Sequence, residues 1–288
     1  MENKETSIFS FKENLTKTPS EVDSSFTRHH AFYVLLLNIA STYVISTILS
    51  FIILAICSFF HLNDNIANSI SQLVSTIVTL GLIIPLMYKT IANDAKVFSK
   101  KTWLVLLLTL GFFVIFYVLV SCLYTDLIEK NIIQSLVKHN IISSGTLQKF
   151  PTSINQIEIE KMLKDNTALI ISIPSIVILA PFLEELIYRK ALFRILNIKV
   201  PGFNAIISGL IFGLVHVIMP IILVLLSLNI EGSDYTIDNL YLESIYFFNY
   251  FICGVLLGII YNISGQNLFI SYLVHLLNNL VVLIDVIL

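Results

Sequence analysis

Seven long apolar stretches constrain this chain more than any other feature of its sequence. Each is long enough for a helix to cross the hydrocarbon core of a bilayer, which takes about 20 residues. None alternates apolar and polar residues with a period of two, so a transmembrane β-barrel is not expected. The stretches lie near residues 31–60, 67–88, 102–123, 167–188, 203–229, 241–262 and 267–288. The sequence therefore predicts an all-α, polytopic transmembrane bundle of about seven or eight helices.

The composition agrees with a membrane protein. Charged residues make up 12% of the 288 residues, whereas soluble domains carry about 25%. So few charges cannot cover a soluble protein of this size, which excludes an ordinary cytosolic enzyme, a secreted disulfide scaffold and a disordered chain. Cys57, Cys122 and Cys253 lie far apart in apolar runs, so we expect neither a disulfide framework nor a zinc finger. The expected surroundings are membrane lipid, and no nucleic-acid partner is indicated.

The distribution of lysine and arginine predicts the orientation. Four basic residues lie in each of three polar segments, and two other loops contain none. Because positive loops stay in the cytoplasm, the basic segments are expected on the cytoplasmic side. The basic segments are 1–30, 89–101 and 189–201, and the loops without lysine or arginine are 61–66 and 230–240. The lysine-containing segment 124–166 would lie outside, which fits the rule poorly.

The same patterns divide the chain into four regions. They are a cytoplasmic polar tail at 1–30, three N-terminal transmembrane helices at 31–123, a polar helical insertion at 124–166 and a transmembrane core at 167–288. Within the insertion, residues 126–139 and 153–164 have helical apolar spacing, which predicts a helical hairpin on the membrane surface. A role of the insertion in gating substrate stays open. Pro220 is expected to kink or divide its span.

The fourth apolar stretch ends in a group of charged residues. Glu184, Glu185 and Arg189 lie there, and charges in hydrocarbon are costly enough that they usually mark function. Glu185 and Arg189 are four residues apart, so they share a helix face and can pair. Glu184 points about 100° away. We therefore expect Arg189 to neutralise one carboxylate while the other stays free for chemistry.

Two histidines lie deep in the later apolar stretches. Phe212 and His216 share one face of their predicted helix, and His275 and Asn279 share one face of the last. Three helices thus present a carboxylate, two imidazoles and an amide, which we expect to converge on a cavity open to the cytoplasm. Taken alone, each histidine is as readily an interhelical hydrogen-bond partner. The combination favours a catalytic site.

These residues form three motifs in a recognisable order. The motifs are EExxxR, FxxxH and HxxxN/D, which read here Glu184-Glu185-Leu186-Ile187-Tyr188-Arg189, Phe212-Gly213-Leu214-Val215-His216 and His275-Leu276-Leu277-Asn278-Asn279. In these motifs the chain resembles the CPBP family of CAAX proteases and bacteriocin-processing membrane proteins, also called the Abi family. The resemblance covers about residues 165–285 and includes a glycine-containing segment at 254–261.

The resemblance implies an intramembrane endopeptidase that cleaves a membrane-associated protein or peptide. Glu184 matches the glutamate of the first motif and His216 the histidine of the second. Together they would hold and deprotonate the attacking water. His275 and Asn279 match the third motif, and they would donate hydrogen bonds to the developing oxyanion. The region 167–288 would then be the catalytic core.

Structural support and cofactor use follow from the same motifs. Glu185 and Arg189 would brace the helix of the first motif. Glu184, His216 and His275 are also a ligand set for catalytic zinc, so a metal-dependent reaction stays open. The chain has no HExxH motif, in which the two ligands and the base share one helix. A reaction without a cofactor is therefore favoured.

Two other functions compete with the protease as interpretations of the sequence. Relatives are associated with bacteriocin self-protection, so the alternative is a non-catalytic membrane immunity or interaction protein. A transporter is disfavoured because the sequence has no repeat symmetry. Its 14 lysines against three arginines, with many Ile and Asn, suggest AT-rich coding DNA and a bacterial plasma membrane. Neither the substrate nor recognition of a prenyl group is indicated.

Overall fold

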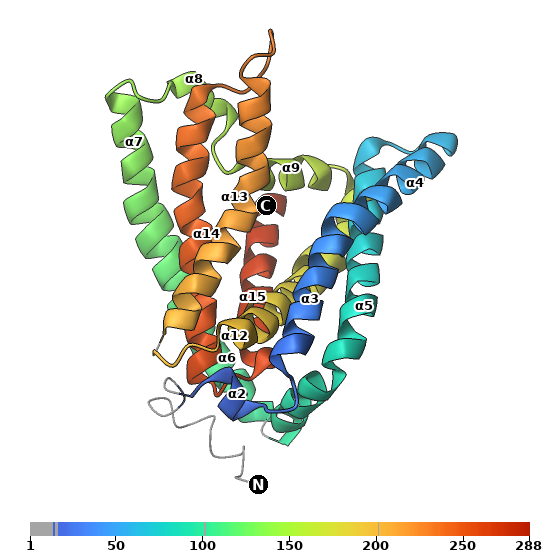
Figure 1. The fold of residues 1–288 in the computed structure, drawn as a ribbon. Coiled ribbons are helices and arrows are strands. Elements are labelled where there is room, and N and C mark those ends of the chain that lie inside the picture. The colour runs from blue at the N-terminus through green and yellow to red at the C-terminus, as the bar shows by residue number, and fades with distance from the viewer. Residues whose placement is uncertain (1–13, 15–16, 101, 201) are drawn as a thin grey trace.

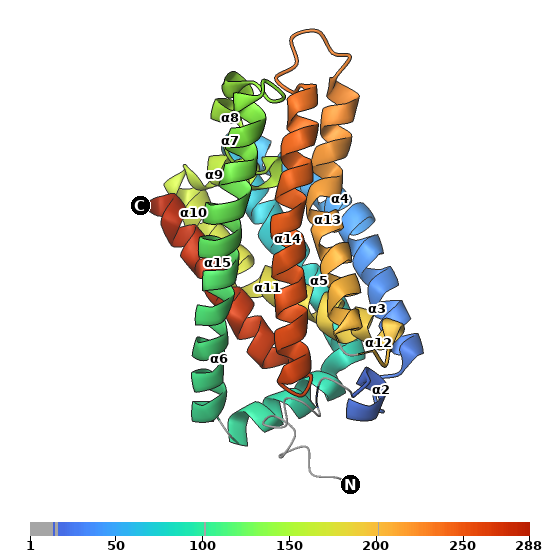
Figure 2. The same cartoon turned by 90° about the vertical axis from the view of Figure 1, so that its left-hand side faces the viewer.

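The computed structural model describes residues 14, 17–100, 102–200 and 202–288. Every regular element in this part of the chain is a helix, and seven helices are long and apolar enough to cross a bilayer. The predicted polytopic helical bundle is therefore confirmed (Figures 1 and 2). The spans are Arg28–Phe59, Asp64–Lys100, Thr102–Lys138, Asn166–Leu196, Phe203–Ser227, Ile237–Ile263 and Leu268–Ile287.

Three of the spans contain wide π-helical turns, labelled η, between α-helical segments. The first span is α3 (Arg28–Ala40), η2 (Ser41–Ile45) and α4 (Ser46–Phe59), and the second is α5 (Asp64–Lys100). The third is α6 (Thr102–Tyr117), η3 (Val118–Glu129) and α7 (Lys130–Lys138). The fourth is α10 (Asn166–Ile173), η4 (Pro174–Leu179), α11 (Ala180–Glu185), η5 (Leu186–Ala191) and α12 (Leu192–Leu196). The last three are α13 (Phe203–Ser227), α14 (Ile237–Ile263) and α15 (Leu268–Ile287), and the short helices are α2 (Pro19–Val22), α8 (Ser144–Lys149) and α9 (Ile154–Leu163).

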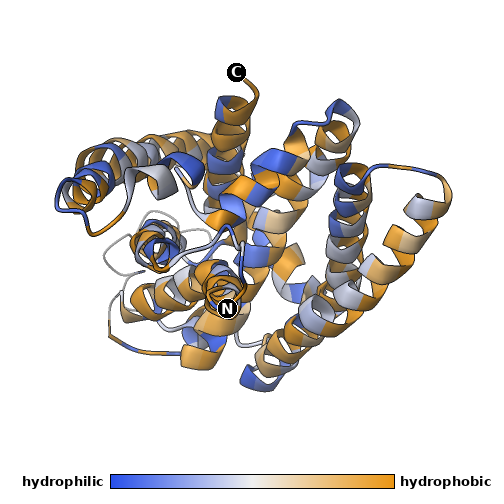
Figure 3. Ribbon diagram, turned by 90° about the horizontal axis from the view of Figure 1, so that it is seen from above, coloured by the Kyte–Doolittle hydropathy of each residue, from blue (hydrophilic) through white to orange (hydrophobic). Residues whose placement is uncertain are grey.

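Large apolar side chains cover the outside of the bundle. Phe51 is 70% exposed and Trp103 86% exposed, values that suit contact with lipid. Figure 3 shows the hydrophobic colouring running along the outer helices when the bundle is seen from above. The first span has few buried residues, so much of its surface faces away from the other helices.

The third span is longer than the apolar pattern predicted. The spacing at 126–139 predicts a separate surface helix, but η3 and α7 continue the third helix through Lys138. Ile133 packs in one cluster with Val224 and Leu242, so this spacing serves contact with α13 and α14. The half of the predicted hairpin that forms a separate helix is α9. Pro220 lies inside α13 without dividing it.

Helices α13 and α14 cross closely through glycine. A Cβ atom on Gly209 would lie 2.6 Å from the backbone N of Val255, and one on Gly254 would lie 2.8 Å from the Cα of Gly209. Larger side chains do not fit there, so the backbones approach as in other small-residue crossings of membrane helices. This crossing brings residues 212–216 against α14.

The described parts of the three basic segments lie at one end of the bundle, as their expected common side predicted. Figure 1 shows α2, the C-terminal end of α5 and α12 at the lower end. The loops that follow α4 and α13 lie at the upper end, together with α8 (Figures 1 and 2).

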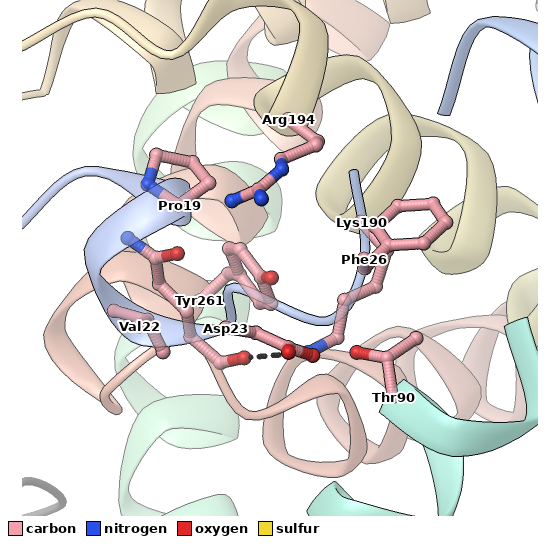
Figure 4. A pocket seen from close by; sticks show the side chains of 9 residues that line it. Pro19, Val22, Asp23, Phe26, Thr90, Lys190, Arg194 and Tyr261 are labelled. Atoms are coloured by element: carbon pink, nitrogen blue, oxygen red, sulfur yellow. Dashed lines mark hydrogen bonds between the residues drawn. The ribbon is translucent and has the colours of Figure 1, made fainter. Parts of the chain in front are cut away.

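A buried polar network closes the lower end of the bundle. Lys190 of η5 pairs with Asp94 of α5 and donates to the carbonyl oxygen of Gln266 at 3.0 Å. Asp94 also accepts from the backbone N of Leu268 at 3.0 Å. Figure 4 shows the cavity beside this network, about 10 Å³ in volume and lined by Pro19, Val22, Asp23, Phe26, Thr90, Lys190, Arg194, Tyr261 and Gln266. It has room for about one water molecule.

Candidate active site

The two glutamates of the first motif lie between two wide turns of the fourth span, and Arg189 lies within the second. Helix α11 follows η4 and precedes η5. Pro174 opens η4 and Pro181 lies in the first turn of α11, and proline removes a backbone donor from helical hydrogen bonding. Such π-helical turns occur frequently at functional sites. The two glutamates then diverge: Glu185 is fully buried, whereas the side chain of Glu184 is 28% exposed.

Glu185 and Arg189 form a buried ion pair, as their spacing predicts. Glu185 Oε2 lies 3.2 Å from Arg189 Nε, and both side chains are fully buried. Arg189 also donates to Ser208 Oγ at 2.7 Å, and that hydroxyl donates to the carbonyl oxygen of Tyr188 at 3.0 Å. The guanidinium lies 5.7 Å from the centre of the Phe212 ring. The pair thereby joins the helix of the first motif to α13.

Helix α15 places His275 between the two glutamates. Its Nδ1 lies 3.2 Å from Glu185 Oε1, within hydrogen-bond distance. Because a carboxylate accepts, Nδ1 carries a proton in this contact. Its Nε2 lies 3.6 Å from Glu184 Oε2, which is longer than a hydrogen bond. Glu185 is thus held by two partners, while Glu184 approaches His275 without being bound to it.

The imidazole of His216 is held by its own helix and by α14. Its Nδ1 lies 2.8 Å from the carbonyl oxygen of Phe212. A carbonyl only accepts, so Nδ1 carries the proton and Nε2 keeps the lone pair of the neutral ring. The ring stacks on Tyr250, with centroids 4.5 Å apart, and lies 4.3 Å from the Phe212 ring. His216 therefore presents a proton acceptor whose ring position is fixed from two sides.

Asn279 makes a contact that its motif did not predict. Its Nδ2 donates to the carbonyl oxygen of Ile176 at 3.0 Å, and Ile176 belongs to the wide turn η4. An amide nitrogen has two hydrogens, so one remains for another acceptor. Asn279 ties α15 to the turn that precedes the first motif.

The residues that the sequence selected lie near one another. Glu184 Oε2 lies 3.6 Å from Nε2 of His275, an approach that the sequence did not predict, since the resemblance implied only that Glu184 and His216 share a water. The Phe212 ring connects the two histidines, since its centre lies 4.3 Å from that of His216 and 6.0 Å from that of His275. These side chains line neither the cavity of Figure 4 nor the one beside Cys57 and His61.

The fit to a metal centre can be tested on the same geometry. Among the residues that the structure describes, no group of three or more His, Cys, Asp or Glu side chains is arranged to hold a metal ion. Glu184, His216 and His275 are thus not arranged as a ligand set here, although the bond of His216 Nδ1 to a carbonyl leaves Nε2 open and would suit a metal ligand. We therefore assign no step to a metal.

A family comparison covers the region that holds every one of these residues. Residues 166–281 match the model of the Rce1-like family, described as type II CAAX prenyl endopeptidase Rce1-like. The match covers this C-terminal part of the chain and does not include residues 1–165. This confirms the resemblance to CAAX proteases that the three motifs indicated. Searches of curated proteins and of solved structures gave no match.

Some contacts within the matched region carry no signal in the sequence. Ser208 and Tyr250 contact Arg189 and His216, but isolated serines and tyrosines in a membrane helix resemble ordinary packing residues. Tyr250 does lie four residues before Gly254, so it falls on the face of α14 that approaches α13. That spacing could have indicated the role of Tyr250, but only if the crossing of α13 and α14 were already known.

Proposed function

We propose that the chain is an intramembrane endopeptidase that hydrolyses a peptide bond of a membrane-associated protein or peptide. The observation that carries this proposal is the contrast between the two neighbouring glutamates. Glu185 is fully buried and held by Arg189 and His275. Glu184 is partly exposed and lies beyond hydrogen-bond distance of His275. A carboxylate with this freedom suits a general base.

Glu184 and His216 would activate the attacking water. With Nδ1 of His216 donating to a carbonyl, Nε2 faces the reaction as an acceptor. The two side chains orient one water and remove its proton as its oxygen attacks the scissile carbonyl carbon. The proton then passes to the leaving nitrogen as the C–N bond breaks. The products are a carboxylic acid and an amine.

His275 and Asn279 would stabilise the oxyanion of the tetrahedral intermediate. Glu185 accepts from Nδ1–H of His275 at 3.2 Å, which directs Nε2 toward Glu184, so Nε2 would donate to the oxyanion from the doubly protonated form of the ring. Asn279 would donate its second amide hydrogen, the one that is not bound to the carbonyl oxygen of Ile176. Donors fixed before the reaction contribute more than donors that must reorganise.

The name of the matched family points to the substrate class to test first. We propose a lipid-modified peptide with a C-terminal CAAX sequence, because a prenyl chain brings the scissile bond to a site within the bilayer. A single lipid chain gives reversible membrane binding, which suits a substrate that must arrive and leave.

Peptide cleavage by the full chain in lipid nanodiscs tests the proposal. The probes are a quenched fluorescent farnesylated CAAX peptide and the same peptide without the farnesyl group. Wild type should cleave, and Glu184→Gln should lose at least about 10²-fold in rate. Glu158→Gln, an exposed glutamate outside the site, is the matched control and should keep full activity. Glu184→Gln activity equal to the control would refute the assignment.

A second measurement covers substrates outside the CAAX class. The membrane proteomes of cells carrying wild type and Glu184→Ala should differ in at least one cleaved protein. Identical proteomes, together with no peptide cleavage, would favour the non-catalytic alternative. Metal content of the active protein, measured by mass spectrometry beside turnover with a chelator, tests the mechanism. If stoichiometric zinc were removed together with activity, the proposal that Glu184 and His216 activate water without a metal would be refuted.

A further inference from the structure

One face of α14 connects the polar insertion to the candidate site. Glu243, Tyr246 and Tyr250 are spaced at i, i+3 and i+7, so they share one face of the helix. Glu243 and Tyr246 are 1% and 5% exposed. Polar side chains buried in a membrane helix need partners, because hydrocarbon offers none.

Residues 150–154 of the insertion supply those partners. The backbone N of Ile154 donates to Glu243 Oε1 at 2.7 Å, and Tyr246 donates to the carbonyl oxygen of Phe150 at 3.4 Å. The hydroxyl of Ser153 lies 2.9 Å from that of Tyr250. Three successive side chains of α14 thus bind one short segment.

Ser153 is itself fixed in place. Its hydroxyl caps α9 by accepting from the backbone N of Gln156 at 3.2 Å, and the residue is 4% exposed. The hydrogen bond to Tyr250 therefore starts from a rigid helix end. It restrains the phenol ring at its outer tip, while the helix restrains it at the backbone.

The other end of this chain of contacts is the candidate base. The Tyr250 ring stacks on the His216 imidazole at 4.5 Å with an angle of 23° between the planes. His216 Nδ1 is held by Phe212, so ring rotation would break both the hydrogen bond and the stack. We infer that Tyr250 is a positioning residue that, locked by Ser153 of the insertion, holds the His216 ring with Nε2 toward the reacting carbonyl. The kinetic part of this inference rests on the proposed function.

The inference makes the insertion part of the site's support. A base must be held within a fraction of an ångström of its working position, and a misplacement of about 1 Å can cost about 10²-fold in rate. Removing the stack should therefore lower kcat, with little change in KM. In metal sites, losing a group that orients a histidine costs about 10- to 100-fold, and we expect a loss of that order here.

Nitrogen NMR of ¹⁵N-histidine-labelled protein reads the ring directly, with His216→Gln used for assignment. Wild type should show His216 as the Nδ1–H form. Tyr250→Leu should give averaged nitrogen shifts and a kcat lower by about 10- to 100-fold. Phe248→Leu, an exposed aromatic on the same helix, is the matched control and should match wild type. Wild-type shifts and wild-type kcat in Tyr250→Leu would overturn the inference.

Milder variants keep the test valid if Tyr250→Leu does not fold. Tyr250→Phe keeps the ring but loses the hydroxyl, and Ser153→Ala removes the same hydrogen bond from the other side. Each should loosen the His216 signals, and the double variant should loosen them no further than Tyr250→Phe, because the Ser153 hydroxyl reaches the ring only through that of Tyr250. Ser153→Ala also removes the cap of α9, and Tyr250→Phe also removes a contact with Asn155. Additive effects, or unchanged signals in both, would overturn the role of Ser153. The NMR result stands even if no peptide is cleaved, so the two proposals can fail separately.

Discussion

At the scale of single residues, adjacent glutamates differ because their surroundings differ. Arg189 and His275 approach Glu185 from two helices, and the side chain has no contact with the outside. Glu184 shares the helix but points to a less enclosed region. Glu185, which contacts two charged or polar partners, therefore stabilises the structure. Glu184, which has no partner within hydrogen-bond distance among these residues, is available to bind water.

Removing the charge of Glu185 should therefore act on stability first. Glu185→Gln leaves Arg189 buried without its countercharge, and breaking a buried pair from one side costs about 3–5 kcal/mol. Thermal unfolding in detergent should show a clear fall in Tm, whereas Glu184→Gln should change Tm little. The double variant Glu185→Gln/Arg189→Met should recover part of the loss, because no unpaired charge remains. An unchanged Tm in Glu185→Gln would contradict this account.

Asn279 combines a tether with a proposed donor. Asn279→Ala should lower turnover by about 10²–10³, the usual effect of losing one oxyanion donor. It should also lower Tm modestly, because the hydrogen bond to Ile176 is lost. Asn278→Ala is the neighbouring control and should leave turnover near wild type. Equal rates in both variants would remove Asn279 from the oxyanion site.

The sequence selected the candidate site residues, but it predicted only one of the contacts between them. Charge inside an apolar run and helical spacing were enough to select Glu184, Glu185, Arg189, His216 and His275 and to pair Glu185 with Arg189. Spacing acts within one helix, so it could not show that His275 would face both glutamates. That contact depends on how α15 packs against α11, which only the tertiary structure defines.

At the scale of elements, wide turns and glycine contacts set where the side chains point. The apolar pattern predicted the number of spans because hydropathy depends on composition alone. It missed the continuation of the third helix through Lys138, because the hydropathy of the polar residues on α7 is the same whether they face water or pack against other helices. It also gave no sign of the π-helical turns, which change hydrogen bonding without changing hydropathy.

The glycine crossing of α13 and α14 should be sensitive to one methyl group. Gly209→Ala places a Cβ 2.6 Å from backbone N of Val255, so the helices must separate. Overpacking of this kind typically costs about 1–3 kcal/mol. Gly111→Ala, where a Cβ meets nothing within 4 Å, should be neutral or stabilising because alanine favours the helix. Comparing the two Tm values checks this; equal values would argue against the close crossing.

The N-cap of α10 should make stability depend on acid pH. Asp165 accepts from the backbone N of Ala168 and from Asn63, and these bonds hold the pKa of its carboxyl below the ordinary value. Because the folded pKa is depressed, the stabilisation is complete above the ordinary pKa and is lost as pH falls through the folded one.

Tm measured across pH tests this cap. The Tm difference between wild type and Asp165→Ala should be constant near neutral pH and should shrink in acid. Asp165→Asn, which keeps a neutral acceptor, should show no such trend against Asp165→Ala. A difference that stays the same at every pH would mean that the charge of Asp165 adds nothing.

At the scale of the whole molecule, the described parts of the three basic segments lie at one end of the bundle (Figure 1), as the alternation of lysine and arginine predicted. Arg189, Lys190 and Arg194 of that set are buried, Lys190 against Asp94. Counting charges in loops predicts that these segments share an end, but it cannot tell a solvated basic side chain from one inside a network.

Cysteine labelling should establish the orientation in cells. In a background without native cysteines, a cysteine at Asp234 should react with a membrane-impermeant reagent added outside. A cysteine at Lys96 should react after the membrane is opened. The positive-inside rule is the physical reason. Labelling of position 234 from the cytoplasm alone would reverse the predicted topology.

The wide turns on both sides of the Glu184–Glu185 pair limit how the length of this chain can vary. A π-helical turn accommodates a residue that an α-helix would not, so deleting one residue from η5 would let the segment relax to regular winding. The helices beyond η5 could then keep their places, because the wide turn holds the extra residue, but the arginine would stand three residues after Glu185 instead of four and would lose the placement of its present ion pair. Substitutions in Leu186–Ala191 keep that winding. In related sequences, this stretch should therefore differ in letters while keeping its number of residues.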